Sequence, residues 1–179
     1  MAVRQSAILF PLLLVLTLFP ASGATGAVTQ VLSATINPAY ALSSPASVSL
    51  THSQNNFQPF QATFTINYEV RTSPAGSGKI TLQMTSDFSP SGGPTVSGGA
   101  LTYVCGSASL GTPCSGSQTA STTSQTPVLT VPASACTGGG GACSSGDPNS
   151  VTLTFTLIDS PTYSTGTYSA NATFTISAI

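Results

Sequence analysis

The sequence predicts an all-β protein, an antiparallel immunoglobulin-like β-sandwich of about seven to nine strands. Several segments alternate apolar and polar residues, which is typical of strands with one buried face. Turn-forming residues separate these segments roughly every ten positions. Beyond the apolar N-terminal run, no segment has the periodicity of an amphipathic helix.

The expected strands follow one another with short connections. They are 28–36, 47–50, 62–71, 79–85, 100–105, 118–123, 128–131, 151–157 and 168–178. A connection with two prolines, 38–45, separates the first two. The second half of the first strand alternates Leu32, Ala34 and Ile36. These three residues form a possible strand-addition segment, for the same sheet or for the sheet of a neighbouring chain.

The strongest strand signal lies over 62–71, where five apolar side chains alternate with five polar ones. The next strand, 79–85, follows a connection rich in Gly, Ser and Pro. We therefore expect these two strands to pair as an antiparallel hairpin. Further along, 86–99 and 133–150 are rich in glycine and are expected to be loops. Two well-alternating strands then close the chain.

The N-terminus predicts a secretory signal peptide. Arg4 precedes an apolar run over 7–19, and small residues follow it. The run is shorter than the roughly 20 residues of a membrane-spanning helix. We expect cleavage after Ala24, with Ala27 as the second choice and a retained anchor as the alternative. The prediction is a signal peptide over 1–24 and one exported domain over 25–179, with no membrane insertion after cleavage.

Charged residues are scarce: the chain has three Lys and Arg, four Asp and Glu, and a net charge of −1. Beyond the signal, Arg71 and Lys79 are the only cations. This excludes a basic surface for nucleic acid or anionic lipid, because both need several cationic contacts. Ser and Thr make up about three residues in ten. Such a neutral, hydroxyl-rich composition suits a secreted, extracellular or cell-surface protein.

Four cysteines indicate disulfide bonds in an exported chain. They are Cys105, Cys114, Cys136 and Cys143. Four cysteines allow three pairings. The local pairs Cys105–Cys114 and Cys136–Cys143 are favoured, since each closes a loop and would stabilise by about 2–3 kcal/mol. A zinc site is the alternative, but it calls for shorter spacings and a nearby His.

Titratable groups do not form a catalytic motif. The carboxylates are Glu69, Asp87, Asp147 and Asp159, and His52 is the only imidazole. No Gly-x-Ser-x-Gly elbow or phosphate-binding glycine loop is present. We therefore expect no enzymatic activity, no cofactor and no metal.

The C-terminus resembles the last strand of chaperone–usher pilin subunits and of spore-coat-U-type secreted pilins. The residues that carry the resemblance are Gly166, Tyr168, Ala170, Ala172, Phe174 and Ile176. Ala178 stands where those pilins commonly have a penultimate Tyr. The resemblance implies an incomplete sandwich that a partner's N-terminal strand completes. The implied partners are other copies, other surface subunits and a periplasmic chaperone.

Two functions follow from the sequence. The first is a structural or adhesive surface protein, such as a pilin-like subunit that assembles by β-strand addition. The alternative is a self-contained secreted module that binds a glycan or a protein through loops 86–99 and 133–150. An open sheet edge would favour the first function, and a complete sandwich would favour the second.

Overall fold

The computed structural model describes residues 30–35, 39–52, 57–71, 76–133 and 148–178. The chain divides into two compact units, residues 1–34 and 35–179. In the first unit, residues 30–34 are exposed and have no regular secondary structure. The predicted signal peptide, 1–24, lies outside the described residues.

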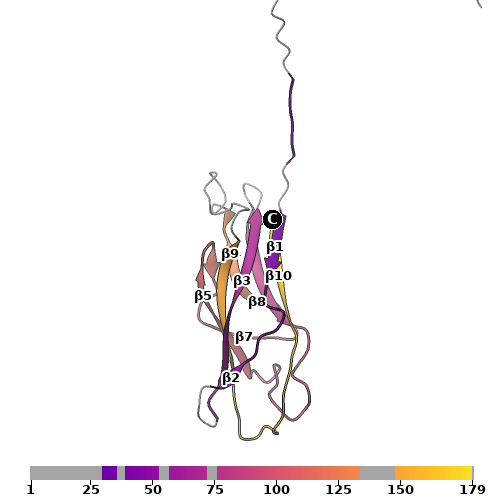
Figure 1. Ribbon diagram of the computed structural model, residues 1–179, viewed down its shortest axis with the longest axis vertical. Coiled ribbons are helices and arrows are strands. Elements are labelled where there is room, and N and C mark those ends of the chain that lie inside the picture. Colours follow the sequence, from indigo (N-terminus) through magenta and orange to yellow (C-terminus); the bar gives the residue numbers. More distant parts are fainter. Residues whose placement is uncertain (1–29, 36–38, 53–56, 72–75, 134–147, 179) are drawn as a thin grey trace, which may run out of the picture. The chain divides into compact units, whose positions relative to one another are not determined.

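The described residues of the second unit form ten strands in two antiparallel sheets (Figure 1). The strands are β1 (Ala39–Ser43), β2 (Thr51–His52), β3 (Phe60–Arg71), β4 (Gly78–Met84), β5 (Leu101–Ala108), β6 (Thr112–Pro113), β7 (Ser117–Thr119), β8 (Thr126–Val131), β9 (Asn149–Leu157) and β10 (Ala172–Ala178). The prediction of an all-β sandwich is confirmed. The number of strands exceeds the expected seven to nine because β2, β6 and β7 are fragments of two or three residues.

The large sheet has the order β1-β3-β9-β5-β7, and β2 pairs with the first residues of β3. The small sheet has the order β10-β4-β8-β6. Constant-type immunoglobulin domains have strands A, B, E and D in one sheet and C, F and G in the other. In this order β1, β3, β9 and β5 take the places of A, B, E and D, while β4 and β10 take those of C and F. Among the described residues, no strand takes the place of G beside β10.

The core lies between the sheets, and most of its residues come from the inward faces of β3, β4, β5, β8 and β9. Its largest fully buried side chains include Tyr68, Tyr103, Ile66, Ile80, Leu82, Leu129 and Leu153. Burial raises the pKa of both tyrosines. Tyr68 donates to the Leu110 carbonyl, and Tyr103 donates to the Pro127 carbonyl at 2.8 Å. The Tyr103 bond ties β5 of the large sheet to β8 of the small sheet.

Most predicted strands recur with shifted ends, but three predictions are wrong. Strands 62–71 and 79–85 do not form a hairpin, because β3 and β4 belong to different sheets. Alternation reports which face of a strand is buried, but it does not select the neighbouring strand.

At the N-terminal end of the domain, residues 30–35 and 47–50 are not strands. The first strand is instead β1, which lies in the predicted connection 38–45. It pairs with the C-terminal half of β3, from Asn67 to Arg71. Its two alternating apolar residues, Tyr40 and Leu42, are too few for a reliable periodic signal.

The described part of the chain also holds no helix long and apolar enough to cross a membrane.

Candidate functional site

The four edges of the two sheets differ in length. In the small sheet, β6 has two residues and β10 has seven. In the large sheet, β7 has three residues and β1 has five. Short edge strands are one way in which soluble proteins avoid pairing with other chains, as are charges and prolines on the edge. The sequence of β10, Ala-Thr-Phe-Thr-Ile-Ser-Ala, has neither charge nor proline. Its outer edge, called the open edge below, is the longest of the four and carries neither of these protections.

The hydrogen bonds beside β10 define which backbone groups face outward. The amide of Thr85 donates to the Asn171 carbonyl at 2.8 Å, so the backbone N–H and C=O groups of Asn171 point toward β4. The direction alternates along an antiparallel strand. The backbone groups of Thr173 and Thr175 therefore point toward β4 as well. Those of Ala172, Phe174 and Ile176 point away from it. These outward groups are the pairing sites that the open edge presents.

Apolar side chains are only half covered along this side of the sandwich. Phe174 of β10 contacts Phe64 of β3 with ring centroids 6.2 Å apart, and both rings are partly exposed. On β1, which lies beside β10 (Figure 1), Tyr40 is 59% exposed and Leu42 is partly exposed. Tyr40 and Leu42 pair with Val70 and Tyr68, whose side chains are buried. Four apolar side chains next to the open edge are therefore incompletely covered: Tyr40, Leu42, Phe64 and Phe174.

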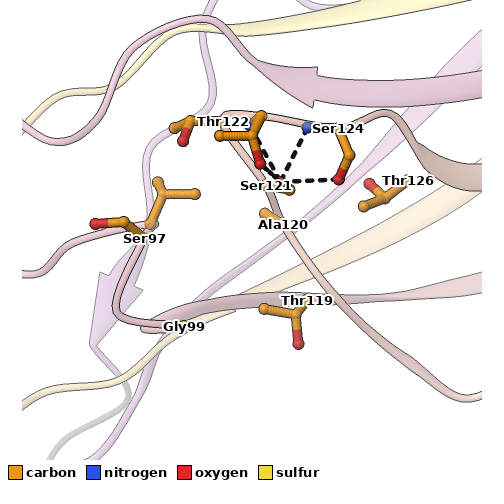
Figure 2. Close-up of a pocket in the computed structure, with 10 residues that line it drawn as sticks. Ser97, Gly99, Thr119, Ala120, Ser121, Thr122, Ser124 and Thr126 are labelled. Atoms are coloured by element: carbon orange, nitrogen blue, oxygen red, sulfur yellow. Dashed lines mark hydrogen bonds between the residues drawn. The ribbon is translucent and has the colours of Figure 1, made fainter.

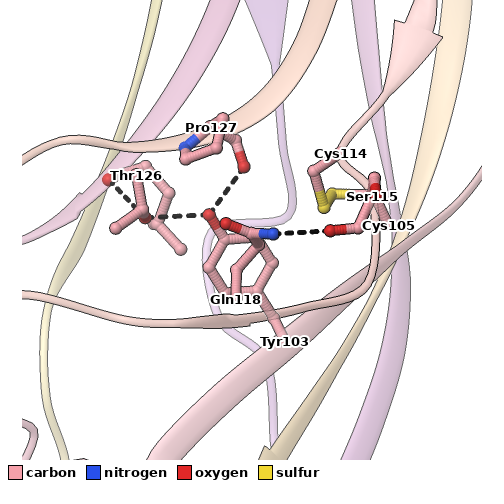
Figure 3. Close-up of a disulfide and its surroundings, with 8 residues drawn as sticks. Tyr103, Cys105, Cys114, Ser115, Gln118, Thr126 and Pro127 are labelled. Carbon is pink, nitrogen blue, oxygen red and sulfur yellow. Dashed lines mark hydrogen bonds between the residues drawn. A yellow bond between two sulfur atoms is a disulfide. The ribbon is translucent and has the colours of Figure 1, made fainter.

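The opposite side of the sandwich carries a disulfide (Figure 3). Cys105 of β5 is bonded to Cys114, and their Cα atoms are 5.3 Å apart. The amide of Cys114 donates to the Val128 carbonyl of β8. The disulfide therefore links β5 of the large sheet to a residue that is hydrogen-bonded to the small sheet. The predicted pair Cys105–Cys114 is confirmed. Cys136 and Cys143 lie outside the described residues.

The residues of the pilin-like ending divide between a loop and a strand. Ala172, Phe174 and Ile176 belong to β10, whereas Gly166 and Tyr168 precede it. Tyr168 donates to the Ser164 carbonyl at 2.6 Å.

The ring of Tyr168 also packs on Gly93, where an added Cβ would lie 2.2 Å from the ring. Gly93 belongs to the predicted loop 86–99. In the same region the amide of Ser164 donates to the Gly92 carbonyl at 2.8 Å. Tyr168 therefore joins the segment before β10 to the loop 86–99. Ala170, between Tyr168 and the strand, is half-buried against the core.

The possible strand-addition segment is only partly described. Leu32 is 89% exposed, and Ala34 is exposed as well. Neither residue belongs to a strand. Ile36 lies outside the described residues.

The titratable groups are dispersed. His52 and Asp159 are 3.9 Å apart between Nε2 and Oδ2, and the His52 ring lies 5.1 Å from that of Phe60. Glu69 lies near the C-terminal end of β3, whereas His52 pairs with Phe60 at the N-terminal end of the same strand. Asp147 lies outside the described residues. Among the residues that the structure describes, no three His, Cys, Asp or Glu side chains come together as a metal site.

Asp87 organises the loop 86–99. Its Oδ1 accepts the amides of Phe88 at 2.8 Å and Val96 at 2.6 Å, and its Oδ2 accepts the Ser97 hydroxyl at 3.1 Å. Partial burial raises the pKa of Asp87, but these hydrogen bonds outweigh it, so the pKa lies below its ordinary value. The charged carboxylate thereby holds the two ends of the loop together.

A hollow of about 370 Å³ lies between this loop and the segment that connects β7 to β8 (Figure 2). The residues that line it are Val96, Ser97, Gly99, Thr119, Ala120, Ser121, Thr122, Thr123, Ser124 and Thr126. Sequence reasoning expected a polar strand over 118–123 and missed the hollow. The run of hydroxyl residues from Thr119 to Thr126 is its only sequence signal.

Comparison with known proteins finds no protein-family model that matches the chain and no match among curated proteins.

Proposed function

We propose that the protein is an exported structural or adhesive surface subunit that assembles by β-strand addition at the open edge of β10. The observation that carries this proposal is the length of that edge: seven uncharged residues with no hydrogen-bonded neighbour beyond β4 among the described residues. An added strand would take the place of G in the immunoglobulin order. Main-chain hydrogen bonds supply the affinity in this mode of recognition.

The half-exposed apolar side chains beside the edge support the same proposal. Strand addition gains specificity from alternate side chains that enter the partner's core. An added strand would bring its inward residues next to Phe64 and Phe174. Covering apolar surface stabilises by about 25 cal/mol per Å². This gain adds to the backbone pairing at Ala172, Phe174 and Ile176.

The donor that we propose is the segment 28–36 of another copy. It has the alternating residues Leu32, Ala34 and Ile36, which would face the partner's core. Leu32 and Ala34 are exposed in their own chain and belong to no strand. The segment carries no charge, so pairing it with β10 buries none.

A proline in the open edge tests the proposal. Ala172→Pro removes one outward N–H and leaves the ladder with β4 intact, since proline is tolerated on edge strands. The matched control is Ser117→Pro. The amide of Ala120 donates to the Leu101 carbonyl, so Ser117 faces away from β5 on the outer edge of β7.

We expect the purified wild-type protein to form oligomers, measured by light scattering after size exclusion. Ala172→Pro should weaken each association about threefold to tenfold, because one hydrogen bond contributes about 0.5–1.5 kcal/mol. Ser117→Pro should assemble like the wild type. Circular dichroism checks that both variants are folded. A wild type that stays monomeric at every concentration, or a folded Ala172→Pro that assembles normally, contradicts the proposal.

The donor is tested separately with Leu32→Asp, whose charge would have to enter the partner's core. This variant should lose assembly while its own thermal unfolding is unchanged. Assembly at wild-type strength would show that another segment is the donor.

A further inference from the structure

Hydrogen bonds within the protein hold both walls of the hollow between the loop 86–99 and the β7–β8 connection. On one wall, Asp87 binds the amide of Val96 and the hydroxyl of Ser97. The amide of Gly99 donates to the Val96 carbonyl at 2.9 Å, and Gly99 has a positive φ of 75° that favours glycine. This wall therefore keeps its shape without a ligand.

The opposite wall is held by Ser121 and its neighbours (Figure 2). The Ser121 Oγ accepts the amides of Thr123 at 3.2 Å and Ser124 at 3.1 Å. The Ser121 carbonyl accepts the Met84 amide at 2.9 Å, and the Thr122 carbonyl accepts the Gln83 side chain at 3.1 Å. Both walls are thus anchored to the sandwich. A preformed site avoids the entropy of ordering loops when a ligand binds.

The lining of the hollow is uncharged and rich in hydroxyl groups. No lining residue is charged, and most of them carry a hydroxyl group. The hydroxyls of Thr119 and Thr122 have no protein partner among the described hydrogen bonds, so they remain available to a ligand. Val96 and Ala120 belong to the buried core beneath the hollow, and each is 2% exposed.

This lining excludes several classes of ligand. An anion would find no cationic side chain, and a metal ion would find no free carboxylate, since Asp87 is engaged with the loop. A large apolar ligand would leave the hydroxyls unpaired. The ligand that matches is neutral and bears several hydroxyls.

We infer that the hollow binds one ring of a neutral sugar. Its volume of about 370 Å³ lies within the roughly 300–1,000 Å³ of small-molecule sites. Thr119 and Thr122 exchange hydrogen bonds with the sugar hydroxyls. The site lies apart from the open edge of β10, and the inference does not depend on the proposed assembly.

The probes are glucose, galactose and mannose, with glucuronate as the charged comparison. Each is titrated into the full-length exported protein labelled with ¹⁵N, and amide chemical shifts are followed. The variant Thr122→Val removes one hydroxyl and keeps the side-chain shape. The matched control is Thr112→Val on β6, an exposed threonine outside the hollow.

We expect at least one neutral sugar to shift amides of 96–99 and 119–126 with a millimolar Kd, and glucuronate to shift them less. Thr122→Val should weaken binding about threefold to tenfold, and Thr112→Val should leave it unchanged. No shift for any neutral sugar at about 100 mM, a hundred times a millimolar Kd, overturns the inference. Shifts confined to other residues, or equal weakening by both variants, overturn it too.

Discussion

At the scale of single residues, Asp87 shows how one of the few charges in the chain is used. It accepts two amides and a hydroxyl from the loop that it begins. Hydrogen bonds to a charged group stabilise more than those between neutral groups. The sequence predicts a loop over 86–99, but it does not reveal that Val96 and Ser97 donate to Asp87.

Replacing Asp87 with Asn tests this role. The folded-state pKa of Asp87 lies below its unfolded value, so the carboxylate stabilises the fold above about pH 4. That contribution is lost as pH falls through the folded-state pKa. Asp87→Asn should therefore lower the free energy of unfolding by about 1 kcal/mol at pH 7. The difference from wild type should shrink toward pH 3.

Urea unfolding at several pH values measures this difference. Ser97→Ala, which removes only one neutral donor, is the control and should cost less at pH 7. A difference between Asp87→Asn and the wild type that does not vary with pH would contradict the role of the charge.

At the scale of elements, the two sides of the sandwich are closed differently. The disulfide from Cys105 to Cys114 joins the sheets on the side of β5, β6 and β8. On the other side, β1 and β10 lie beside each other without pairing. The contact of Phe64 with Phe174 joins the sheets there. One side is thus closed covalently, and the other by partly exposed apolar contacts.

The disulfide restricts the unfolded chain, and this effect is modest for a short closed loop. Removing it with Cys105→Ala and Cys114→Ala should therefore lower the free energy of unfolding by about 2–3 kcal/mol. Thermal unfolding measures this loss. Assembly below the melting temperature should be unchanged, since the open edge lies on the other side. Loss of assembly in the folded double variant would mean that the disulfide shapes the open edge.

At the scale of the whole molecule, the scarcity of charge is the dominant property. Only 4% of residues are charged, against the roughly 25% of an average domain. Electrostatic steering and ion pairs therefore contribute little to any contact that the protein makes. Backbone pairing, apolar burial and hydroxyl groups remain as the sources of affinity.

Assembly should accordingly be insensitive to sodium chloride. Between about 10 mM and 1 M salt the Debye length falls from about 30 Å to 3 Å, which would weaken charged contacts strongly. We expect the oligomer distribution in sedimentation velocity to stay the same over this range. Dissociation at high salt would show that the assembly depends on charged contacts.

The sequence by itself determined the fold class and the buried face of the main strands. Alternation in 62–71 and 151–157 is a local property, because successive side chains of a strand point to opposite faces. The favoured pair Cys105–Cys114 was also predictable from the sequence, since a disulfide that closes a short loop joins residues that are near each other in the chain.

Only the tertiary structure decided which strands are neighbours. It placed β3 and β4 in different sheets and left β10 at an edge. It also brought 96–99 beside 119–126 to form the hollow. These arrangements depend on contacts between residues far apart in the chain. Periodicity carries no information about such contacts, because it records the burial of each residue and not the identity of its neighbours.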